Sequence, residues 1–481
     1  MQLAVVVRTL GVLFLLFSTT LVPPAVVAFI YKDGHFSHFS MTVGITALAG
    51  LLLWLPYRHK THSIRNRDGF GIVALMWVFM SLLGSVPFML GLGMDFTDAL
   101  FESASGYTTT GSTVLVGLDF LDPSILLYRQ EIQWVGGIGV IVLAVAMLPM
   151  LGIGGMQLYK AETPGPFKDE RITPRITHTA RTLAVLYVGM TLACAISYRI
   201  AGMSTFDAIA HSLSTLSTGG YSTHDESMGF FDSAAIDAIA VVFMLVGAIS
   251  FNVHFVVWRS FRFGEYFRND QVRTLLVVSL AIGLFVAFLL HQSGNSTGIG
   301  HAIHLGIFEV VSVITSTGFG IVDFSIWPLG LPVILIFSSF MGGCAGSTAG
   351  GMKVIRFLVL ARQAGVYIHK LIHPRLVRPV RLDGRVVEAS VVDGVWAFFT
   401  VYIVAFGILM ILLMMNGLDQ VSAFGAVATC LNNLGPGLGD VAANFTSVDE
   451  ASKVVLVVAM ILGRLEIFTI LVLLSPSFWR G

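Results

Sequence analysis

The sequence predicts an all-α polytopic membrane protein. Four parallel helix–half-helix–loop–helix repeats surround a central axis, and two extra transmembrane helices precede them. Of 481 residues, 55% are hydrophobic and only 12% charged, which leaves too little polar surface for a soluble protein of this size. Apolar windows of membrane-spanning length recur along the chain. Between them, a polar loop recurs four times at intervals of about 108 residues, which is typical of an internal repeat.

The apolar runs define ten predicted transmembrane segments, each long enough to cross a hydrocarbon core of about 30 Å. They cover residues 5–30, 40–56, 70–93, 128–150, 182–201, 234–257, 273–290, 329–360, 393–415 and 454–474. The first run is longer than the apolar region of a signal peptide, so it is predicted to remain as a helix.

The repeats divide the chain into five predicted parts. A two-helix extension is followed by four pore repeats, of which the third has a broken inner helix. The parts are residues 1–68 (extension), 69–156, 157–258, 259–392 and 393–481.

Basic residues distinguish the two sides of the predicted membrane. Most Lys and Arg residues lie in the connectors that follow the even-numbered spans, so the positive-inside rule places these connectors and both termini in the cytoplasm. The opposite side is rich in Asp and Glu. An acidic outer face concentrates cations near an entrance, although outer loops that are simply polar and poor in lysine have the same composition. The formal net charge is zero, which gives no indication of a nucleic-acid partner.

Each polar loop follows an apolar segment too short to cross the membrane, and such segments are typical of half-helices. The four segments read FTDALFESASG, STFDAIAHSLS, HAIHLGIFEVVS and QVSAFGAVATC. Since every repeat has two full spans, all four repeats face the same way, and their loops meet on one axis along the membrane normal. Irregular backbone at membrane depth is tolerated where it lines a watery path, so the loops are predicted to line a central pore.

The loop composition indicates a site for a dehydrated monovalent cation. Backbone carbonyls replace the water shell of such an ion, and glycine allows successive carbonyls to point inward. Hydroxyl groups add ligands, and half-helices whose C-terminal ends point to the centre add a negative dipole. An ordinary polar turn explains one such loop but not four in register. The predicted ion ligands are Thr109, Thr110, Gly111, Ser217, Thr218, Gly219, Ser316, Thr317, Gly318, Asn433, Leu434 and Gly435.

The motifs TTTGST, STGGY, STGFG and NNLGPG, each between an outer and an inner helix, resemble the Trk/Ktr/HKT superfamily of potassium transporters. The bacterial Trk-type membrane subunit is the most similar member, and the resemblance covers essentially the whole chain. It implies a potassium-channel-like fold with one selectivity glycine per repeat, at Gly111, Gly219, Gly318 and Gly435. In this superfamily four glycines accompany potassium selectivity, whereas serine in the first loop accompanies sodium transport.

The resemblance also implies K⁺ as the transported ion, no covalent cofactor, a location in the bacterial inner membrane, a homodimer, and a separate cytosolic nucleotide-binding ring that gates the subunit. One departure from tetrameric channels is the missing TVGYG-like strip. The residues after the glycines differ among the loops, so we expect looser selectivity, with passage of Rb⁺ and some Na⁺. These residues are Ser112, Gly220, Phe319 and Pro436.

The inner helix of the third repeat is interrupted by MGGCAGSTAGGMK. Each glycine weakens a helix by about 1 kcal/mol, so this segment is predicted to break the helix and to form an intramembrane gate. The alternative interpretation is close helix packing through small residues. The predicted gate residues are Gly342, Gly343, Gly346, Ser347, Thr348, Gly350 and Gly351, together with Arg464.

Arg464 and Glu466 lie inside the last apolar span. A charge there is costly, by at least about 2.5–3.5 kcal/mol on insertion scales, so each is expected to face the pore or a partner. We expect Arg464 to contact carbonyls of the 342–351 loop and to repel cations, with an ordinary buried ion pair as the alternative. Glu466 is expected to be the partner of another helix, because residues two apart do not share a helix face.

Two other functions would each require features that can be looked for in the sequence. A proton- or sodium-coupled symporter requires a carboxylate at mid-membrane, and Glu466 is the candidate. A membrane enzyme requires a convergent catalytic set, which the sequence does not contain, so no enzymatic activity is expected. The basic connectors at 157–181, 259–273 and 353–392 form a predicted docking face for the cytosolic ring, although anionic membrane lipid attracts the same residues.

Overall fold

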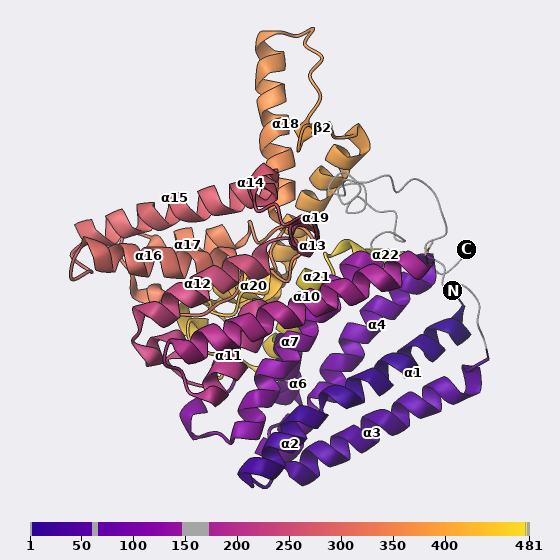
Figure 1. Ribbon diagram of the computed structural model, residues 1–481. Coiled ribbons are helices and arrows are strands. Elements are labelled where there is room, and N and C mark those ends of the chain that lie inside the picture. The colour runs from indigo at the N-terminus through magenta and orange to yellow at the C-terminus, as the bar shows by residue number, and fades with distance from the viewer. Residues whose placement is uncertain (1, 60–65, 147–172, 477, 479–481) are drawn as a thin grey trace.

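The computed structural model describes residues 2–59, 66–146, 173–476 and 478, and helices make up almost all of its regular structure. Figure 1 shows one helical body from which α18 (Val354–Ile372) projects. The antiparallel strands β1 (Arg381–Leu382) and β2 (Arg385–Val386) follow α18 and form a small hairpin. The predicted all-α fold is therefore confirmed.

Two helices of the N-terminal extension are in close backbone contact. A Cβ atom added to Gly11 would lie 2.8 Å from the carbonyl oxygen of Gly50, and one added to Gly50 would lie 2.9 Å from that of Gly11. These two glycines therefore allow the helices to touch through their backbones. The extension contains α1 (Leu3–Thr20), α2 (Val22–Tyr31), α3 (Phe36–Trp54) and the 3-10 helix η1 (Leu55–Tyr57).

Four groups of helices follow along the chain. The first contains α4 (Asn66–Gly84), α5 (Val86–Leu92), α6 (Phe96–Tyr107), η2 (Leu118–Phe120) and α7 (Pro123–Ala146). The second contains α10 (Thr173–Ile200), α11 (Thr205–Leu216), η3 (Ser227–Phe231), α12 (Ala234–Ala248) and α13 (Phe251–Ser260). The third contains α14 (Gly264–Arg268), α15 (Asp270–Gln292), α16 (Ile299–Ile314), η4 (Phe324–Ile326), α17 (Leu331–Ser339) and α18. The fourth contains α19 (Ala389–Met415), α20 (Gln420–Asn432), η5 (Gly439–Val441), α21 (Glu450–Arg464) and α22 (Phe468–Leu474).

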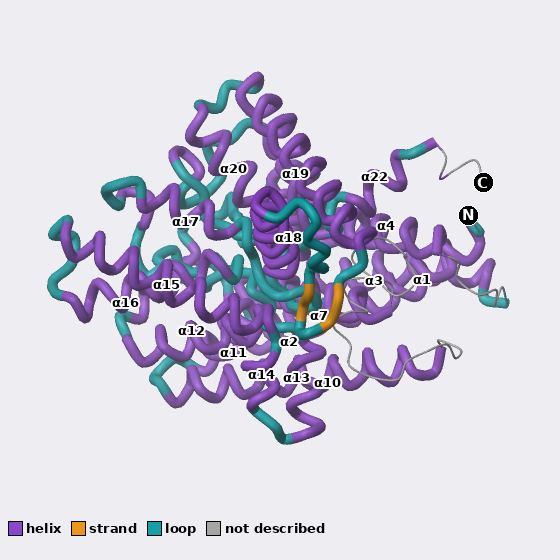
Figure 2. Tube along the Cα trace, turned by 90° about the horizontal axis from the view of Figure 1, so that it is seen from above, coloured by secondary structure: helices purple, strands orange, loops and turns teal. Residues whose placement is uncertain are grey.

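The predicted half-helices correspond to α6, α11, α16 and α20. Two of them begin at a side-chain cap: Ser204 Oγ accepts a hydrogen bond from the N–H of Asp207 at 3.0 Å, and Asp419 Oδ1 accepts one from the N–H of Val421 at 2.8 Å. All four end at the polar loops, so their negative dipole ends face these loops. Figure 2 shows loop segments at the middle of the molecule with helices around them.

Two inner helices that we predicted as single spans are bent, so these two predictions were wrong. The 234–257 segment consists of α12 and α13 at 98°, and the 454–474 segment consists of α21 and α22 at 110°. The 329–360 segment is broken between α17 and α18, as predicted. In the described residues, six helices are long and apolar enough to cross a membrane, or up to eight if each bent pair is one span.

The bend between α12 and α13 is stabilised by the broken third inner helix. The N–H of Cys344 donates to the carbonyl of Ala248 at 2.8 Å, and the N–H of Phe251 donates to the carbonyl of Gly346 at 3.0 Å. These bonds replace those that a continuous helix would make at this point. The apolar pattern of the sequence is the same for a straight and a bent segment, so the pattern alone did not reveal the bend.

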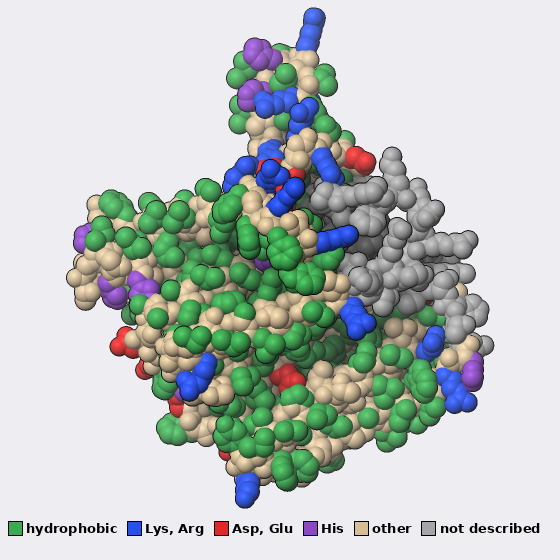
Figure 3. Space-filling model, viewed as in Figure 1, with side chains coloured by type: hydrophobic (Ala, Val, Ile, Leu, Met, Phe, Trp, Pro, Cys, Tyr) green, Lys and Arg blue, Asp and Glu red, His purple; other side chains and the backbone are tan. Residues whose placement is uncertain are grey.

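The outer surface is apolar around the helical body. Figure 3 shows hydrophobic side chains over most of the visible face, whereas Lys and Arg side chains gather around α14 and the projecting α18. Exposed side chains on α10 and α15 include Leu192, Ile196, Val277, Leu280 and Phe288. Such a surface fits contact with lipid. The domain boundary predicted at residue 156 and most of the 157–181 connector lie outside the described residues.

Candidate ion pathway

The four polar loops share one backbone conformation. In each loop a non-glycine residue has positive φ, and a glycine with positive φ follows two positions later. The non-glycine residues are Thr109 (53°), Thr218 (51°), Ser316 (53°) and Asn433 (54°), and the glycines are Gly111 (85°), Gly220 (77°), Gly318 (79°) and Gly435 (109°). The residue between these two positions donates its N–H to a carbonyl group of the preceding half-helix at 2.8–2.9 Å in every loop. The donor and acceptor pairs are Thr110 and Ser105, Gly219 and Ser214, Thr317 and Ser312, and Leu434 and Thr429.

The register predicted for the second loop was wrong by one residue. Gly220, not Gly219, occupies the place of the other three glycines, because Gly220 has the positive φ. Ser217 lies one position too early, and its hydroxyl donates to the carbonyl of Leu213 within the half-helix at 2.8 Å. The loop contains two adjacent glycines, and their sequence alone does not decide which of them adopts the left-handed conformation.

The four glycines close a ring of loops. A Cβ atom added to Gly111 would lie 2.2 Å from the carbonyl oxygen of Gly219 in the next loop. A Cβ atom added to each of the other three glycines would likewise lie close to a carbonyl oxygen of the following loop. The distances are 1.9 Å from Gly220 to Thr317, 2.0 Å from Gly318 to Leu434, and 3.1 Å from Gly435 to Thr110. The loops therefore surround one axis in chain order, with a row of carbonyl groups between neighbouring loops.

Several hydroxyl groups in the ring bond to one another. The hydroxyls of Thr108 and Thr110 are 2.7 Å apart, as are those of Thr315 and Thr317. Asn433 differs, since its amide donates to Thr110 Oγ1 at 2.9 Å and ties the fourth loop to the first. Oxygen-rich, carbonyl-lined loops of this kind suit a partly dehydrated monovalent cation.

The segment between α17 and α18, residues 340–353, lies against the ends of the half-helices. Thr348 Oγ1 donates to the carbonyl of Leu216 at 3.0 Å, and the N–H of Gly351 donates to that of Asn432 at 2.9 Å. The N–H of Gly350 donates to Ser316 Oγ at 2.5 Å. This segment, called the gate loop below, thus contacts the second, third and fourth polar loops or their half-helices.

Glycine is required at several positions of the gate loop. Gly342, Gly346 and Gly351 have positive φ values of 65°, 74° and 71°. A Cβ atom added to Gly350 would lie 2.0 Å from the carbonyl oxygen of Asn432. The remaining predicted members pack inside the loop: Gly343 lies against Ala349, and Ser347 donates to the carbonyl of Cys344 at 2.7 Å. The alternative of two helices packed through small residues is therefore incorrect, since the loop is not helical.

Arg464, at the end of α21, bonds to backbone carbonyls. Its guanidinium donates to the carbonyl of Thr348 at 2.8 Å and to that of Gly136 at 3.3 Å, and the side chain is buried. The first bond is the contact to the 342–351 loop that the sequence led us to expect. Arg464 has no acidic ion-pair partner among the described residues. Glu466 instead pairs with Arg356 of α18, as expected for the partner of another helix.

Sequence reasoning missed a second buried cation beside the gate loop. Lys353 was assigned to the cytoplasmic connector, but it is buried and its ammonium donates to the carbonyl of Ala349. Its position directly after MGGCAGSTAGGM was a usable signal, because a lysine that ends an intramembrane loop is expected to face that loop.

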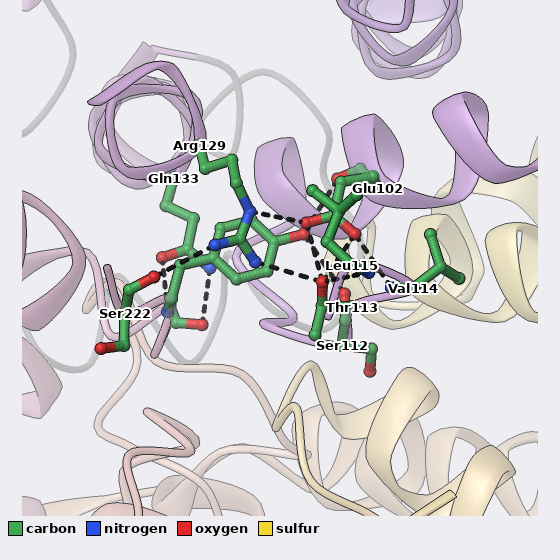
Figure 4. Close-up of polar contacts among 10 residues, drawn as sticks. Glu102, Ser112, Thr113, Val114, Leu115, Arg129, Gln133 and Ser222 are labelled. Carbon is green, nitrogen blue, oxygen red and sulfur yellow. Dashed lines mark hydrogen bonds and ion pairs between the residues drawn. The ribbon is translucent and has the colours of Figure 1, made fainter. Parts of the chain in front are cut away.

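A buried polar network behind the first two polar loops was also missed. Figure 4 shows Arg129 and Gln133 on α7 pointing toward the segment that carries Ser222, with Glu102 on the other side of Arg129. Arg129 Nε lies 2.9 Å from Glu102 Oε1, and Nη1 lies 3.1 Å from the carbonyl oxygen of Ser222. Both charged side chains are fully buried. Their separation along the sequence gave no signal that they form a pair.

The fold and this ring of carbonyl-lined loops define a multi-pass membrane protein that transports cations. The family model "TrkH: Cation transport protein" matches residues 35–480. The chain is 48% identical to "Trk system potassium uptake protein TrkH" of Vibrio parahaemolyticus and 44% identical to that of Escherichia coli, and each match covers 100% of both chains. It superposes on the crystal structure of the potassium transporter TrkH from Vibrio parahaemolyticus with a TM-score of 0.93, at 46% identity over 100% of both chains.

The chain therefore belongs to the TrkH family of cation transport proteins. This confirms the superfamily that the polar loops resemble. It also makes the protein a transporter rather than an enzyme.

Proposed function

We propose that the chain takes up potassium across the bacterial inner membrane, with the four polar loops as its selectivity filter. The ring of glycines, each against the carbonyl group of the next loop, carries this proposal. Four glycines accompany potassium selectivity in the superfamily that the loops resemble. Relatives with 44–48% identity over the whole chain are potassium uptake proteins by name.

The filter residues are, in this proposal, Thr109, Thr110, Gly111, Thr218, Gly219, Gly220, Ser316, Thr317, Gly318, Asn433, Leu434 and Gly435. Carbonyl oxygens bind the ion, and the negative ends of four half-helices stabilise its charge. No carboxylate is required at the ion itself, so K⁺ binds without being trapped. The irregular residues after the glycines allow Rb⁺ and some Na⁺ to pass.

The gate loop closes the path at the inner end of the filter. It bonds to the second, third and fourth loop regions, and Arg464 and Lys353 place two positive charges beside it. A cation leaving the filter meets both the loop and these charges. Opening requires the loop to leave the bonds that it makes to Leu216 and Asn432.

The projecting part of the chain supports our proposal for the cytoplasmic partners. We place both termini and the α18 hairpin in the cytoplasm, where a nucleotide-binding ring controls a homodimer through the gate loop at the root of α18. The exposed basic residues of this projection are Lys370, Arg375, Arg378, Arg381 and Arg385. Replacing Arg375 and Arg378 by Glu should abolish co-purification of the ring while preserving the cation flux of the protein alone in proteoliposomes. Intact co-purification together with loss of bound anionic lipid would indicate a lipid contact instead.

Coupled symport is the second candidate, and one observation disfavours it. The carboxylate on which it would depend, Glu466, is already held by Arg356. A carboxylate that carries a proton or Na⁺ through each cycle needs to exchange this partner for its cargo.

The test is cation flux into proteoliposomes that contain the purified protein. A K⁺ gradient alone should drive uptake of Rb⁺ tracer, with less uptake of Na⁺ and none in protein-free liposomes. Flux that requires an imposed proton or sodium gradient would reject the channel mechanism in favour of symport. Equal flux of K⁺ and Na⁺ would reject the filter assignment.

A further inference from the structure

We infer that Gln133 of α7 is a positioning residue that tunes the cation selectivity of the second loop. The inference rests on the proposed role of the four loops as a filter. It adds a residue outside the loops, on the inner helix of the neighbouring repeat, to the groups that decide which cation passes.

Gln133 holds two backbone groups of the second loop at once. Its amide Nε2 donates to the carbonyl of Gly219 at 2.7 Å, and its Oε1 accepts from the N–H of Tyr221 at 3.1 Å. The side chain is fully buried, so no water competes for either bond. Gly219 and Tyr221 flank the left-handed Gly220. The two hydrogen bonds therefore hold the loop on both sides of its filter glycine.

The same side chain explains why Gly219 is a glycine. Gly219 does not have positive φ, so its backbone conformation does not require glycine. However, a Cβ atom added to Gly219 would lie 2.4 Å from Cδ of Gln133, and the three nearest atoms all belong to Gln133. At the equivalent position the other loops have Thr110, Thr317 and Leu434. Gln133 thus occupies the space that a side chain of the loop fills elsewhere.

The half-helices indicate why the second loop needs this support. Eight residues before these positions, the first and third half-helices carry glutamates. Glu102 accepts from the N–H of Val114 at 3.1 Å, and Glu309 accepts from the N–H of Ile321 at 2.9 Å. The second half-helix has His211 there, which bonds to the Ser222 hydroxyl at 2.9 Å. The two glutamates hold the backbone N–H three residues after the filter glycine, whereas in the second loop Gln133 holds the N–H directly after Gly220.

The chemical consequence concerns the carbonyl oxygen of Gly219. This oxygen lies beside Gly111 in the ring, where it is a candidate ligand for the ion. An amide hydrogen bond at 2.7 Å limits its movement and uses part of its electron density. Discrimination against the smaller Na⁺ needs carbonyls that do not collapse inward, so releasing this oxygen should favour Na⁺ relative to K⁺.

The experiment compares Na⁺ and Rb⁺ flux in proteoliposomes for Gln133→Ala, Gln133→Glu and a matched control, Gln130→Ala. Gln130 is on the same helix, is equally buried, and its amide has no hydrogen-bond partner among the described residues. Gln133→Glu keeps the acceptor for Tyr221 but loses the donor to Gly219. Both Gln133 variants lose the bond to the carbonyl of Gly219, so both should raise the Na⁺/Rb⁺ flux ratio by about fivefold, the effect of that one hydrogen bond. Gln130→Ala should leave the ratio unchanged.

A reciprocal exchange tests the packing. Gly219→Thr alone should abolish Rb⁺ flux, because its side chain collides with Gln133, and Gln133→Ala in the same chain should restore flux by making room. Restoration supports the inference even if Gln133→Ala alone is unstable.

An unchanged flux ratio in folded Gln133 variants would overturn the inference. So would an equal change in Gln130→Ala, or full activity of Gly219→Thr by itself. If the unmodified protein does not distinguish K⁺ from Na⁺, it is the proposed filter that fails, and this result is distinct from failure of the Gln133 inference.

Discussion

The guanidinium of Arg464 donates a hydrogen bond to the carbonyl oxygen of Thr348 at 2.8 Å, and so joins the last inner helix to the gate loop. The Thr348 hydroxyl lies 3.0 and 2.9 Å from the carbonyl oxygens of Leu216 and Gly247, and these two acceptors share its single proton. The fourth repeat therefore holds a loop of the third repeat against the second. A change at any one of these contacts is transmitted directly to the gate loop.

Removing the charge of Arg464 should open the pathway. Arg464→Ala eliminates a buried positive charge and a bond to the gate loop, so passive K⁺ flux should rise by about tenfold. Arg464→Lys, which keeps the charge but not the paired donors, should show a smaller increase. The measurement is Rb⁺ uptake into proteoliposomes under a K⁺ gradient. Equal or slower flux in Arg464→Ala would show that Arg464 is not part of the barrier.

The filter glycines should differ in their tolerance of serine. Gly111→Ser, Gly220→Ser and Gly318→Ser each place a Cβ atom at most 2.2 Å from a carbonyl oxygen, whereas at Gly435 the distance is 3.1 Å. The first three variants should lose K⁺ flux by about tenfold or more, and Gly435→Ser should lose less.

The matched control for these variants is Gly117→Ser. Gly117 also has positive φ, at 73°, but its nearest neighbour is a side-chain atom of Phe120 at 3.9 Å. It experiences the same left-handed strain, about 1–2 kcal/mol for a non-glycine residue, without contact to a carbonyl. If Gly117→Ser reduces flux as much as Gly220→Ser does, backbone strain rather than the ring contact is responsible.

The ion pair between Glu466 and Arg356 should stabilise the bend between α21 and α22. Glu466 and Ile467 both have positive φ, at 55° and 49°, which is unfavourable for side chains of this size. Glu466→Gln leaves Arg356 without its acidic partner and should lower the free energy of unfolding by about 1–3 kcal/mol.

Thermal unfolding of Glu466→Gln, Arg356→Met and the double variant measures this coupling. The double variant should be less destabilised than the two single changes together. Glu450→Gln, an exposed acid at the start of α21, is the control. If Glu466→Gln leaves stability intact but removes a dependence of uptake on a proton or sodium gradient, the symport alternative is correct.

An outer cluster around His224 should make stability depend on pH. His224 Nδ1 lies 2.5 Å from Asp119 Oδ1, and Nε2 lies 3.5 Å from Asp207 Oδ1. Burial alone would lower the pKa of His224, but bonds to the Asp207 and Asp119 carboxylates outweigh it and raise the pKa. A raised folded-state pKa gives stability that is complete below the ordinary value, about 6.5, and is lost as pH rises through the raised value.

Thermal unfolding measured from about pH 6 to pH 9 tests this direction. The stability advantage of the unmodified protein over His224→Gln should shrink as pH rises, whereas exposed His291→Gln should show no such trend. A constant difference across this range would mean that His224 contributes by packing on Phe230 rather than by its charge.

The sequence determined the membrane fold, the four loops and the break in the third inner helix. These features are local: apolar length requires a membrane, and five glycines within residues 342–351 interrupt a helix wherever the chain places them. Arg464 was also identifiable, because a charge inside an apolar span needs a polar partner.

The tertiary structure decided what depends on distant partners. Gly220 rather than Gly219 is left-handed because the loop is held against Thr317 on one side and Gln133 on the other. The bend after Ala248 exists because Cys344 supplies the hydrogen bond that the helix would otherwise make for itself. Helix propensity and hydropathy are the same for either outcome, so only contacts between repeats select the register and the bends.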